Sequence, residues 1–223
     1  MIVLNPLNLP CFIDTVESLQ NEFKQDMSDD IVIVGISEVS RRYDVAYFKQ
    51  QYGIKGKIIA FNQEPLLAKQ RKFMHFKFFK FLKDADEVWD YDERQVAIIK
   101  MVNSNTHLHV LKPYKDWSKY SSVKKDIDIL FYGSLNEHRK NVLNALAKKH
   151  NLVICNGNHG EQLDSYIARS KTLLNIHYYY ECAMQEQARM IRWIGAPCDI
   201  ISEVSWKNYL GVTEMNYNDL FLL

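Results

Sequence analysis

Short runs of β-branched and aromatic residues alternate with amphipathic segments along almost the whole chain. The predicted strands cover residues 1–4, 31–35, 57–62, 87–89, 107–111, 127–132, 152–155, 172–177 and 199–202. The predicted helices cover residues 12–23, 43–51, 66–82, 93–101, 141–150, 162–170 and 185–194. This alternation predicts an α/β fold in which parallel strands are joined by helical crossovers.

One polar stretch interrupts the pattern. Residues 112–125 are rich in Lys, Ser and Pro, and they lack the periodic apolar positions of the neighbouring segments. Such a composition is typical of a linker. We therefore expect an N-terminal domain over residues 1–117 and a C-terminal domain over residues 118–223.

Composition sets the class of protein. The 223 residues are 47% hydrophobic and 13% aromatic, which is enough for a sizeable core. With 28 basic and 27 acidic residues the formal charge is +1, so attraction to a polyanion has to come from a local patch. The four cysteines lack zinc-ligand spacing, and no apolar run reaches the roughly 18 residues of a membrane span. We expect a protein of the cytosol or of a host cell, with no metal, no cofactor and no insertion into a membrane.

The clearest chemical signal is the apolar run that ends at Gly133 and restarts as a charged helix-forming segment. A glycine permits a sharp turn, and the N–H groups at the start of the next helix attract anions. Ser134, Arg139 and Lys140 surround this turn, so it suits a phosphate or diphosphate. The alternative is a turn glycine followed by a solvated basic pair.

The following strand–helix unit offers further polar groups. His177 and Tyr178 end a predicted strand, Glu186 lies in the first turn of the next predicted helix, and Arg189 lies one turn further along it. A carboxylate there suits the hydroxyls of a ribose, and an arginine one turn later suits a phosphate. The alternatives are a half-buried structural histidine and a favourable charge at a helix N-terminus.

In the first half, polar residues also follow the predicted strands. Glu64 is the candidate general base for a hydroxyl nucleophile, and Asn62 and Asp90 are candidate acceptor-binding residues. Alternatively, Glu64 caps the helix that follows, and Asp90 begins the next one. The basic and aromatic segment 69–83, with Lys72 and Lys77, suits a polyanion, or else it is a solvated helix face.

Taken together, these motifs resemble glycosyltransferases of the GT-B architecture, especially small bacterial, phage and algal-virus members. The resemblance rests on DILFYGSLNEHRK at 128–140, ARSK at 168–171, LNIHY at 174–178, QEQARM at 185–190 and ISE at 201–203, with NQE at 62–64 and EVWDY at 87–91. It implies two Rossmann-like domains facing a central cleft, with the nucleotide sugar held by the C-terminal one.

The resemblance also implies roles. Gly133, Ser134 and Arg139 or Lys140 would contact the diphosphate of a UDP- or GDP-sugar. His177 and Tyr178 would line the donor pocket, with His177 as a catalytic candidate, and Glu186 with Arg189 would hold ribose, sugar or phosphate. Catalysis would need no metal. Many retaining members carry two glutamates eight positions apart, whereas Ile194 stands eight positions after Glu186.

Three functional hypotheses follow. The first is transfer of a sugar to a glycan or another hydroxyl acceptor. The second is a phage-type enzyme that glycosylates a hydroxylated base in DNA, with the segment 69–83 lying along the backbone. The third is an inactive two-domain protein that binds a nucleotide.

Overall fold

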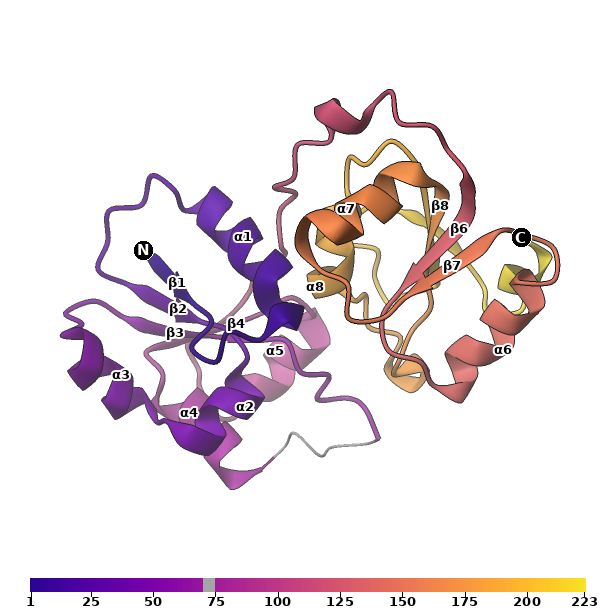
Figure 1. Ribbon diagram of the computed structural model, residues 1–223. Helices are drawn as coiled ribbons and strands as arrows, with labels where there is room; N and C mark the ends of the chain where they lie inside the picture. Colours follow the sequence, from indigo (N-terminus) through magenta and orange to yellow (C-terminus); the bar gives the residue numbers. More distant parts are fainter. Residues whose placement is uncertain (70–74) are drawn as a thin grey trace. The chain divides into compact units, whose positions relative to one another are not determined.

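The computed structural model describes residues 1–69 and 75–223 (Figure 1). The chain forms two units. The first comprises Met1–Tyr114 and Gln187–Ile191, and the second comprises Lys115–Glu186 and Arg192–Leu223. The division after Tyr114 lies close to the predicted one after residue 117, but the short segment Gln187–Ile191 joins the first unit.

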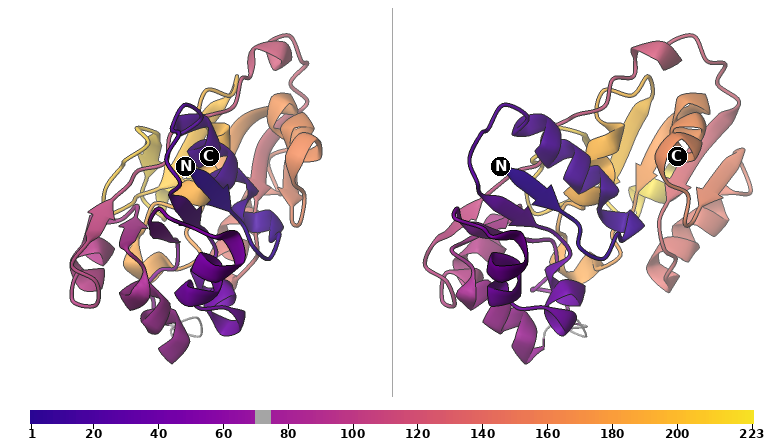
Figure 2. Two further views of the ribbon diagram at one scale, coloured as in Figure 1. Left: turned by 90° about the vertical axis from the view of Figure 1, so that its left-hand side faces the viewer. Right: turned by 60° about the vertical axis from the view of Figure 1, so that its left-hand side comes forward.

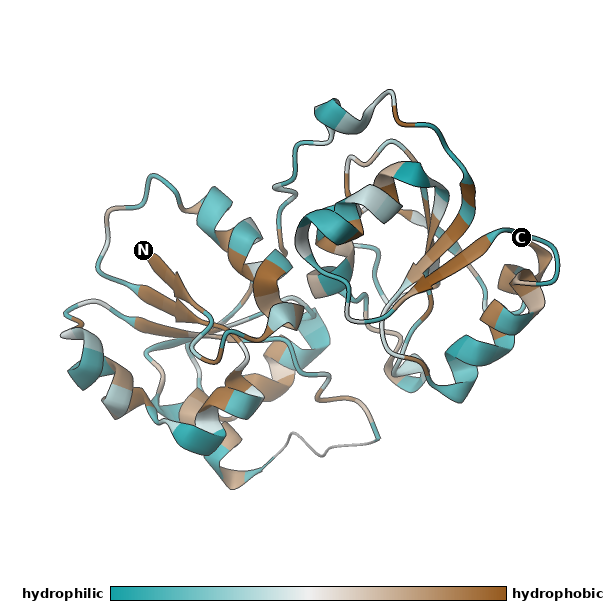
Figure 3. Cartoon of the chain, viewed as in Figure 1, coloured by the Kyte–Doolittle hydropathy of each residue, from teal (hydrophilic) through white to brown (hydrophobic). Residues whose placement is uncertain are grey.

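The first unit contains a five-stranded parallel sheet whose strands lie in sequence order. The strands are β1 (Ile2–Leu4), β2 (Ile31–Ile33), β3 (Ile58–Asn62), β4 (Glu87–Asp90) and β5 (Thr106–Leu108). Every residue of β2 and β3 is buried, as expected for parallel strands covered on both faces. Figure 3 shows these strands as hydrophobic along their length.

Helices cover both faces of this sheet. The helix α1 (Ile13–Glu22) lies on one face, and α2 (Ile36–Arg42), α3 (Val45–Tyr52), α4 (Phe76–Asp84) and α5 (Glu93–Ile99) lie on the other (Figure 2). The main core of the unit forms on the second face, where Ile33 and Ala60 pack with Val39, Phe48 and Phe81. Burial of these side chains fixes which residues of β2 and β3 face the helices.

The second unit contains another five-stranded parallel sheet, with strand order β10-β9-β8-β6-β7. The strands are β6 (Ile127–Tyr132), β7 (Leu152–Cys155), β8 (Ser170–Asn175), β9 (Asp199–Glu203) and β10 (Thr213–Met215). The chain adds β7 on one side of β6 and then β8 on the other. The strand order therefore reverses between β6 and β8. In doubly wound sheets, ligands bind at the carboxyl ends of the strands where the order reverses.

One face of the second sheet packs against α6 (Glu137–Leu146) and the 3₁₀ turn η5 (Asp219–Leu222), through a core that includes Phe131, Leu143 and Leu220. The helix α7 (Gly160–Arg169) contacts β6 and β8. Shorter elements complete the chain: the 3₁₀ turns η1 (Pro10–Phe12), η2 (Ser118–Tyr120), η3 (Tyr180–Cys182) and η4 (Ile191–Trp193), and α8 (Gln187–Met190).

The predicted α/β class is confirmed. Two five-stranded parallel sheets flanked by helices are consistent with two Rossmann-like domains. The first sheet differs from a doubly wound one because its strand order does not reverse. In the described part of the chain, no helix has the length and the apolar character needed to cross a membrane.

Several element boundaries differ from the predictions. The predicted helix 66–82 was wrong in extent, because α4 begins at Phe76 and residues 66–69 form a turn. The predicted helix 185–194 is the single turn α8 followed by a 3₁₀ turn, while α6 begins earlier than expected, after the cap Asn136. The helix α2 and the strand β10 were not predicted.

Candidate functional site

The strand-order reversal in the second unit lies beside the glycine turn that ends β6. Gly133 has φ of +135°, which is in the region that favours glycine, and its N–H donates to the carbonyl of Cys155 at 3.0 Å. Asn136 then caps α6 by accepting from the N–H of Arg139 at 3.0 Å. Its own amide donates to the carbonyl of Tyr178 at 2.8 Å, which joins the start of α6 to the segment after β8.

Arg139 forms a buried ion pair with Glu186. Its Nη2 donates to both carboxylate oxygens of Glu186, at 2.9 and 3.0 Å, and one of these oxygens also accepts from the backbone N–H of Tyr178 at 3.0 Å. The guanidinium lies 5.3 Å from the ring centroid of Phe131 and 5.1 Å from that of Tyr178. Two aromatic rings and a carboxylate therefore compensate the buried charge.

The remaining donors of Arg139 bind the backbone. Nε donates to the carbonyl of Ile176 at 2.8 Å, and Nη1 donates to the carbonyl of Ser134 at 2.7 Å. Only 3% of the residue is exposed. In this arrangement Arg139 fixes the turn after β6 and the end of β8, and its direct contact with a diphosphate stays a prediction.

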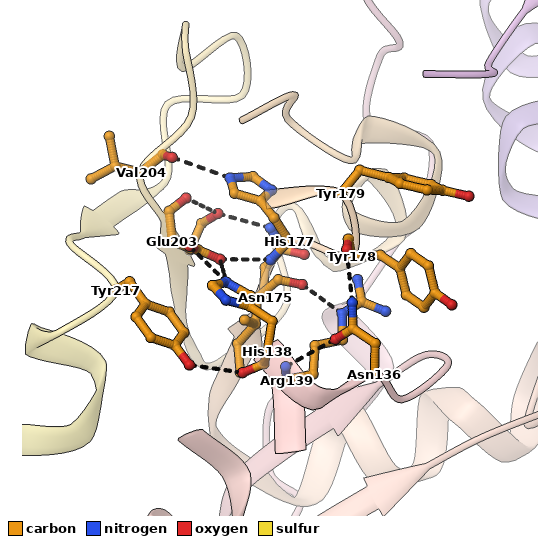
Figure 4. Close-up of polar contacts among 12 residues, drawn as sticks. Asn136, His138, Arg139, Asn175, His177, Tyr178, Tyr179, Glu203, Val204 and Tyr217 are labelled. Atoms are coloured by element: carbon orange, nitrogen blue, oxygen red, sulfur yellow. Dashed lines mark hydrogen bonds and ion pairs between the residues drawn. The ribbon is translucent and has the colours of Figure 1, made fainter. Parts of the chain in front are cut away.

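A second pair lies one residue earlier on α6. Nε2 of His138 donates to the two carboxylate oxygens of Glu203 at 2.9 and 3.0 Å, and Glu203 also accepts from the backbone N–H of His177 at 2.8 Å (Figure 4). The imidazole of His138 is stacked between Tyr180, at 4.5 Å, and Tyr217, at 4.0 Å. The Nε2 atom of His138 therefore binds Glu203, and both faces of its ring pack against tyrosines. These contacts hold this region together.

The two pairs have the same design. Successive residues of α6 each bind a carboxylate, and each carboxylate accepts a successive backbone N–H of the segment after β8. We call this arrangement the double clamp, made of His138, Arg139, Glu186, Glu203 and the backbone N–H groups of His177 and Tyr178. It fixes the start of α6 against the carboxyl end of β8, where the strand order reverses.

His177 occupies a central place in this region. It is 1% exposed, and its Nε2 donates to the carbonyl of Val204 at 3.2 Å (Figure 4). A carbonyl only accepts, so Nε2 carries a proton. The other ring nitrogen, Nδ1, is buried and has no hydrogen-bond partner among the described residues.

Two other predicted cations lie outside the double clamp. Lys140 is about half exposed and pairs with Glu137 at 3.0 Å on the surface of α6. Arg189 lies on α8 and therefore in the first unit, whereas Glu186 belongs to the second. The predicted roles of both in ligand binding stay predictions.

In the first unit, Glu64 follows β3 and accepts a hydrogen bond from the hydroxyl of Ser37 at 2.5 Å. Ser37 lies in the first turn of α2. Burial raises the pKa of the Glu64 carboxyl, and the hydrogen bond from Ser37 opposes this increase. A carboxylate with a raised pKa is a stronger base, which suits the predicted role. No helix begins directly after Pro65, so Glu64 does not act as a helix cap.

Asp90 is fully buried at the end of β4, where it accepts from Nδ2 of Asn62 at 2.7 Å and from Nε2 of Gln95 at 3.0 and 3.1 Å. Burial raises the pKa of Asp90 to about 7. Because both amide NH₂ groups face Asp90, both amide oxygens face the turn after β3. They accept from the N–H groups of Glu64 and Leu66. Asn62 and Asp90 thus support the turn that carries Glu64.

The basic and aromatic segment is partly described. Lys72 lies outside the described residues. Lys77 is exposed on α4 and donates to the carbonyl of Arg41 at 3.3 Å. Together with Arg42, Lys80 and three aromatic side chains it lines a cavity of about 280 Å³; the full lining is Ser40, Arg42, Tyr43, Asp44, Phe76, Lys77, Lys80 and Phe81.

The sequence did not reveal every residue of the site. His138, Glu203, Ser37 and Gln95 were not predicted as functional, although Glu203 stands directly at the end of a predicted strand. That position was the available signal for Glu203. Among the residues that the structure describes, no group of three or more His, Cys, Asp or Glu side chains is arranged to hold a metal ion.

No family model matches the chain. Similar proteins occur in Acanthamoeba polyphaga mimivirus. The chain is 26% identical to "Uncharacterized protein L140" over 218 residues, which cover 89% of this chain and 67% of that protein. It is 29% identical to "Uncharacterized protein L137" over 135 residues, 56% of this chain and 18% of that protein. For "Uncharacterized protein L138" the identity is 29% over 119 residues, 48% of this chain and 13% of that protein. The chain therefore spans less than a fifth of the length of two of these relatives.

Proposed function

We propose that the chain is a metal-independent glycosyltransferase of the GT-B type, which transfers a sugar from a nucleoside-diphosphate sugar to a hydroxyl acceptor. The observation that carries the proposal is the position of the double clamp. It lies where the strand order of the second sheet reverses, at the carboxyl ends of β6 and β8, and α/β sheets bind nucleotides at this point.

The chemistry of the second unit suits a diphosphate leaving group. The turn at Gly133 brings the backbone to the start of α6, whose first N–H groups and dipole favour negative charge. Lys140, exposed on the first turns of α6, adds a cation nearby. Fixed donors of this kind stabilise the charge that develops on a departing diphosphate. In this proposal Arg139 does not contact the diphosphate but holds the turn in place, because its Nη1 donates a hydrogen bond to the carbonyl of Ser134.

In the same proposal the first unit supplies the acceptor site. Glu64 removes the proton of the acceptor hydroxyl, and its raised pKa favours that step. Ser37 and the turn held by Asn62 and Asp90 orient the carboxylate. A side chain held on several sides loses little freedom in the reaction, which is a recognised source of rate enhancement.

A direct test is a panel of nucleotide sugars. Ligands that bind the folded protein raise its unfolding temperature, with a gain of about 2.7 kcal/mol at a concentration of one hundred times Kd. We expect UDP or GDP, and one sugar conjugate of that nucleotide, to stabilise the protein. When an acceptor is supplied, we expect release of the nucleoside diphosphate. If no nucleotide and no nucleotide sugar in the panel raised the unfolding temperature, the proposal would be refuted.

A second candidate is transfer to a hydroxylated base in DNA. The cavity beside α4 favours it, because Arg42, Lys77 and Lys80 supply cations, and Phe76, 80% exposed, offers a face for base stacking. Under this hypothesis, charge reversal at Lys77 and Lys80 weakens binding of DNA and lowers its salt dependence. With a glycan acceptor the same changes leave KM unchanged, so KM at two salt concentrations separates the two candidates.

The third candidate, a nucleotide-binding protein without catalytic activity, differs from the first in one measurement. Such a protein is stabilised by a nucleotide sugar but releases no nucleoside diphosphate with any acceptor.

The mimivirus proteins similar to the chain support a viral setting, and we therefore place the activity in the cytoplasm of an infected cell.

A further inference from the structure

The cavity beside α4 in the first unit combines aromatic and cationic walls. It measures about 280 Å³, and we call it the α4 cavity. The walls that matter for binding are three aromatic and three basic residues: Tyr43, Phe76, Phe81, Arg42, Lys77 and Lys80. Pockets that enclose a whole drug-sized ligand measure roughly 300–1,000 Å³. The α4 cavity therefore suits one ring system with one small substituent, and it is too small to enclose a nucleotide sugar.

The aromatic walls differ in how firmly they are held. The ring of Tyr43 stacks on that of Tyr47, with centroids 4.5 Å apart, and meets the edge of Phe48 at 5.9 Å. Phe81 is 2% exposed and is packed against Phe48. By contrast, Phe76 is 80% exposed and makes no ring contact with another aromatic side chain among the described residues. Two walls are thus preformed, and Phe76 is left to stack on a ring that enters the cavity.

The cations around the cavity keep hydrogen-bond donors for a ligand. Arg42 is exposed at the end of α2, and in the described part of the chain no carboxylate pairs with it. Lys77 donates to the carbonyl of Arg41 at 3.3 Å, and Lys80 forms an ion pair with Asp84. An ammonium group has three N–H donors, so one such contact leaves others available. A guanidinium and two ammonium groups at one cavity suit a phosphate group.

Negative charges limit the size of the anion. Asp44 lines the cavity and caps α3 by accepting from the N–H of Tyr47 at 2.8 Å. Three cations and one carboxylate give the lining a net charge of +2, which matches the charge of a single phosphate group, up to about −2 at pH 7. Glu38 and Asp84 lie on α2 and α4 next to these cations, so an extended polyanion would meet carboxylates as well. The charge pattern therefore favours a compact anion over a nucleic acid strand.

The α4 cavity is also distinct from the site of the proposed base. Ser37, which donates to Glu64, lies in the first turn of α2, whereas Arg42 is the last residue of that helix. Five residues of a helix span about 8 Å along its axis. The cavity lies beyond this far end of α2, where α2 packs against α4 (Figure 1).

We propose that the α4 cavity binds a small aromatic phosphate, which is a single ring system bearing one phosphate group, as in a nucleoside monophosphate. The ring packs against Tyr43 and Phe76, and the phosphate binds Arg42, Lys77 and Lys80. This site goes beyond the proposed function and does not depend on it, because neither Glu64 nor any residue of the double clamp takes part.

An NMR titration with phenyl phosphate tests the proposal. We expect shifts of the backbone amides of Arg42 and Lys77, and an affinity at least about tenfold higher than that of inorganic phosphate or of phenol, because each of these lacks one of the two contacts. Phe76→Ala should weaken binding of phenyl phosphate about tenfold, the effect of one stacking contact, and leave that of inorganic phosphate unchanged.

The charges are tested with a matched control. Arg42→Gln and Lys77→Gln should each weaken binding of phenyl phosphate about tenfold, as expected for a charge-assisted hydrogen bond. Lys83→Gln makes the same change of charge at an exposed residue of α4 outside the cavity, and it should bind like the wild type. All these side chains are exposed, so the variants should keep the fold.

Several results would overturn the proposal. Equal weakening by Lys83→Gln would mean diffuse attraction of anions, and equal affinity for inorganic phosphate would mean that the ring is not recognised. Absence of any shift, or shifts confined to the second unit, would show that the cavity does not bind the ligand. An octamer of thymidylate that binds far more tightly, with affinity falling by a log–log slope of about 2 or more in salt, would assign the cavity to an extended strand instead.

Discussion

Removing the Arg139 guanidinium tests whether the double clamp holds the second unit together. Arg139→Met keeps much of the volume of the side chain and removes its charge and donors. Glu186 then loses its cation, and the carbonyls of Ser134 and Ile176 lose their donors at 2.7 and 2.8 Å. The variant therefore leaves a carboxylate and two backbone acceptors without the partners they have in the wild type.

The magnitude follows from burial. Removing one partner of a buried ion pair typically costs about 3–5 kcal/mol. The Arg139 side chain is 3% exposed but that of Glu186 is 20% exposed, so water partly compensates the carboxylate. We therefore expect a loss near the lower end, about 3 kcal/mol of unfolding free energy. Adding Glu186→Gln removes the unpaired charge, and we expect a coupling energy of about 1–3 kcal/mol in the double-mutant cycle.

Urea unfolding followed by tryptophan fluorescence measures these energies. Trp117, Trp193 and Trp206 lie in the second unit and Trp89 in the first, so the signal reports mainly on the unit that changes. The matched control is the pair of Lys140 with Glu137, whose side chains are 48% and 83% exposed. For this solvated pair we expect a coupling below about 0.5 kcal/mol.

A coupling of the buried pair no larger than that of the control would refute the reasoning. Affinity for UDP adds a second criterion under native conditions. If Arg139 positions the site through Glu186, Arg139→Met and Glu186→Gln lower UDP affinity together. If Arg139 contacts the diphosphate directly, Arg139→Met alone lowers it, by about 1.5–3 kcal/mol for a charge-assisted hydrogen bond.

Three further outcomes are expected. Gly133→Ala and Gly157→Ala both introduce a side chain at positive φ and should each cost about 1 kcal/mol of stability, but only Gly133→Ala should weaken UDP binding, because Gly157 follows β7 rather than the strand at the reversal; equal loss of UDP affinity in both variants would contradict this. Glu64→Gln should lower kcat by roughly 10² to 10⁴ with little change in the affinity for UDP, and an unchanged kcat would exclude Glu64 as the base. EDTA should leave turnover unchanged, since fixed N–H groups stabilise the leaving group in the proposed mechanism, and loss of turnover that manganese restores would refute metal-independent transfer.

The fold class was predictable because local sequence determines it here. Parallel strands such as β2 and β3 are buried on both faces and therefore read as continuous apolar runs. The helix α2 escaped detection because its sequence, from Ile36 to Arg42, is short and mostly polar, and only Ile36 and Val39 attach it to the core. The strand order of either sheet depends on contacts between distant segments, which the alternation of strands and helices does not encode.

The candidate site was predictable to the extent that it follows strand ends. Gly133 and His177 were singled out for that reason, and Glu186 because it lies in the first turn of the next predicted helix. The structure brings His177 and Glu186 to the double clamp. The pairing itself was not predictable. Arg139 looked like a free cation beside a turn, whereas burial against Phe131 makes its ion pair with Glu186 the dominant interaction. The choice between a ligand contact and an internal pair depends on packing.

The pH dependence of stability offers a test of the network behind Glu64. The pKa of Asp90 is about 7 in the folded protein, against about 3.9 in an unfolded chain. Between these values the folded state binds the extra proton, so Asp90 favours folding at low pH, and this contribution is lost as pH rises through 7. The full difference corresponds to about 4 kcal/mol. Asp90→Asn does not titrate, so the stability of the wild type minus that of the variant should fall by a few kcal/mol between pH 4 and pH 8. Parallel curves for the two proteins would show that the pKa of Asp90 is the same in the folded and the unfolded chain, and would contradict the raised pKa of Asp90.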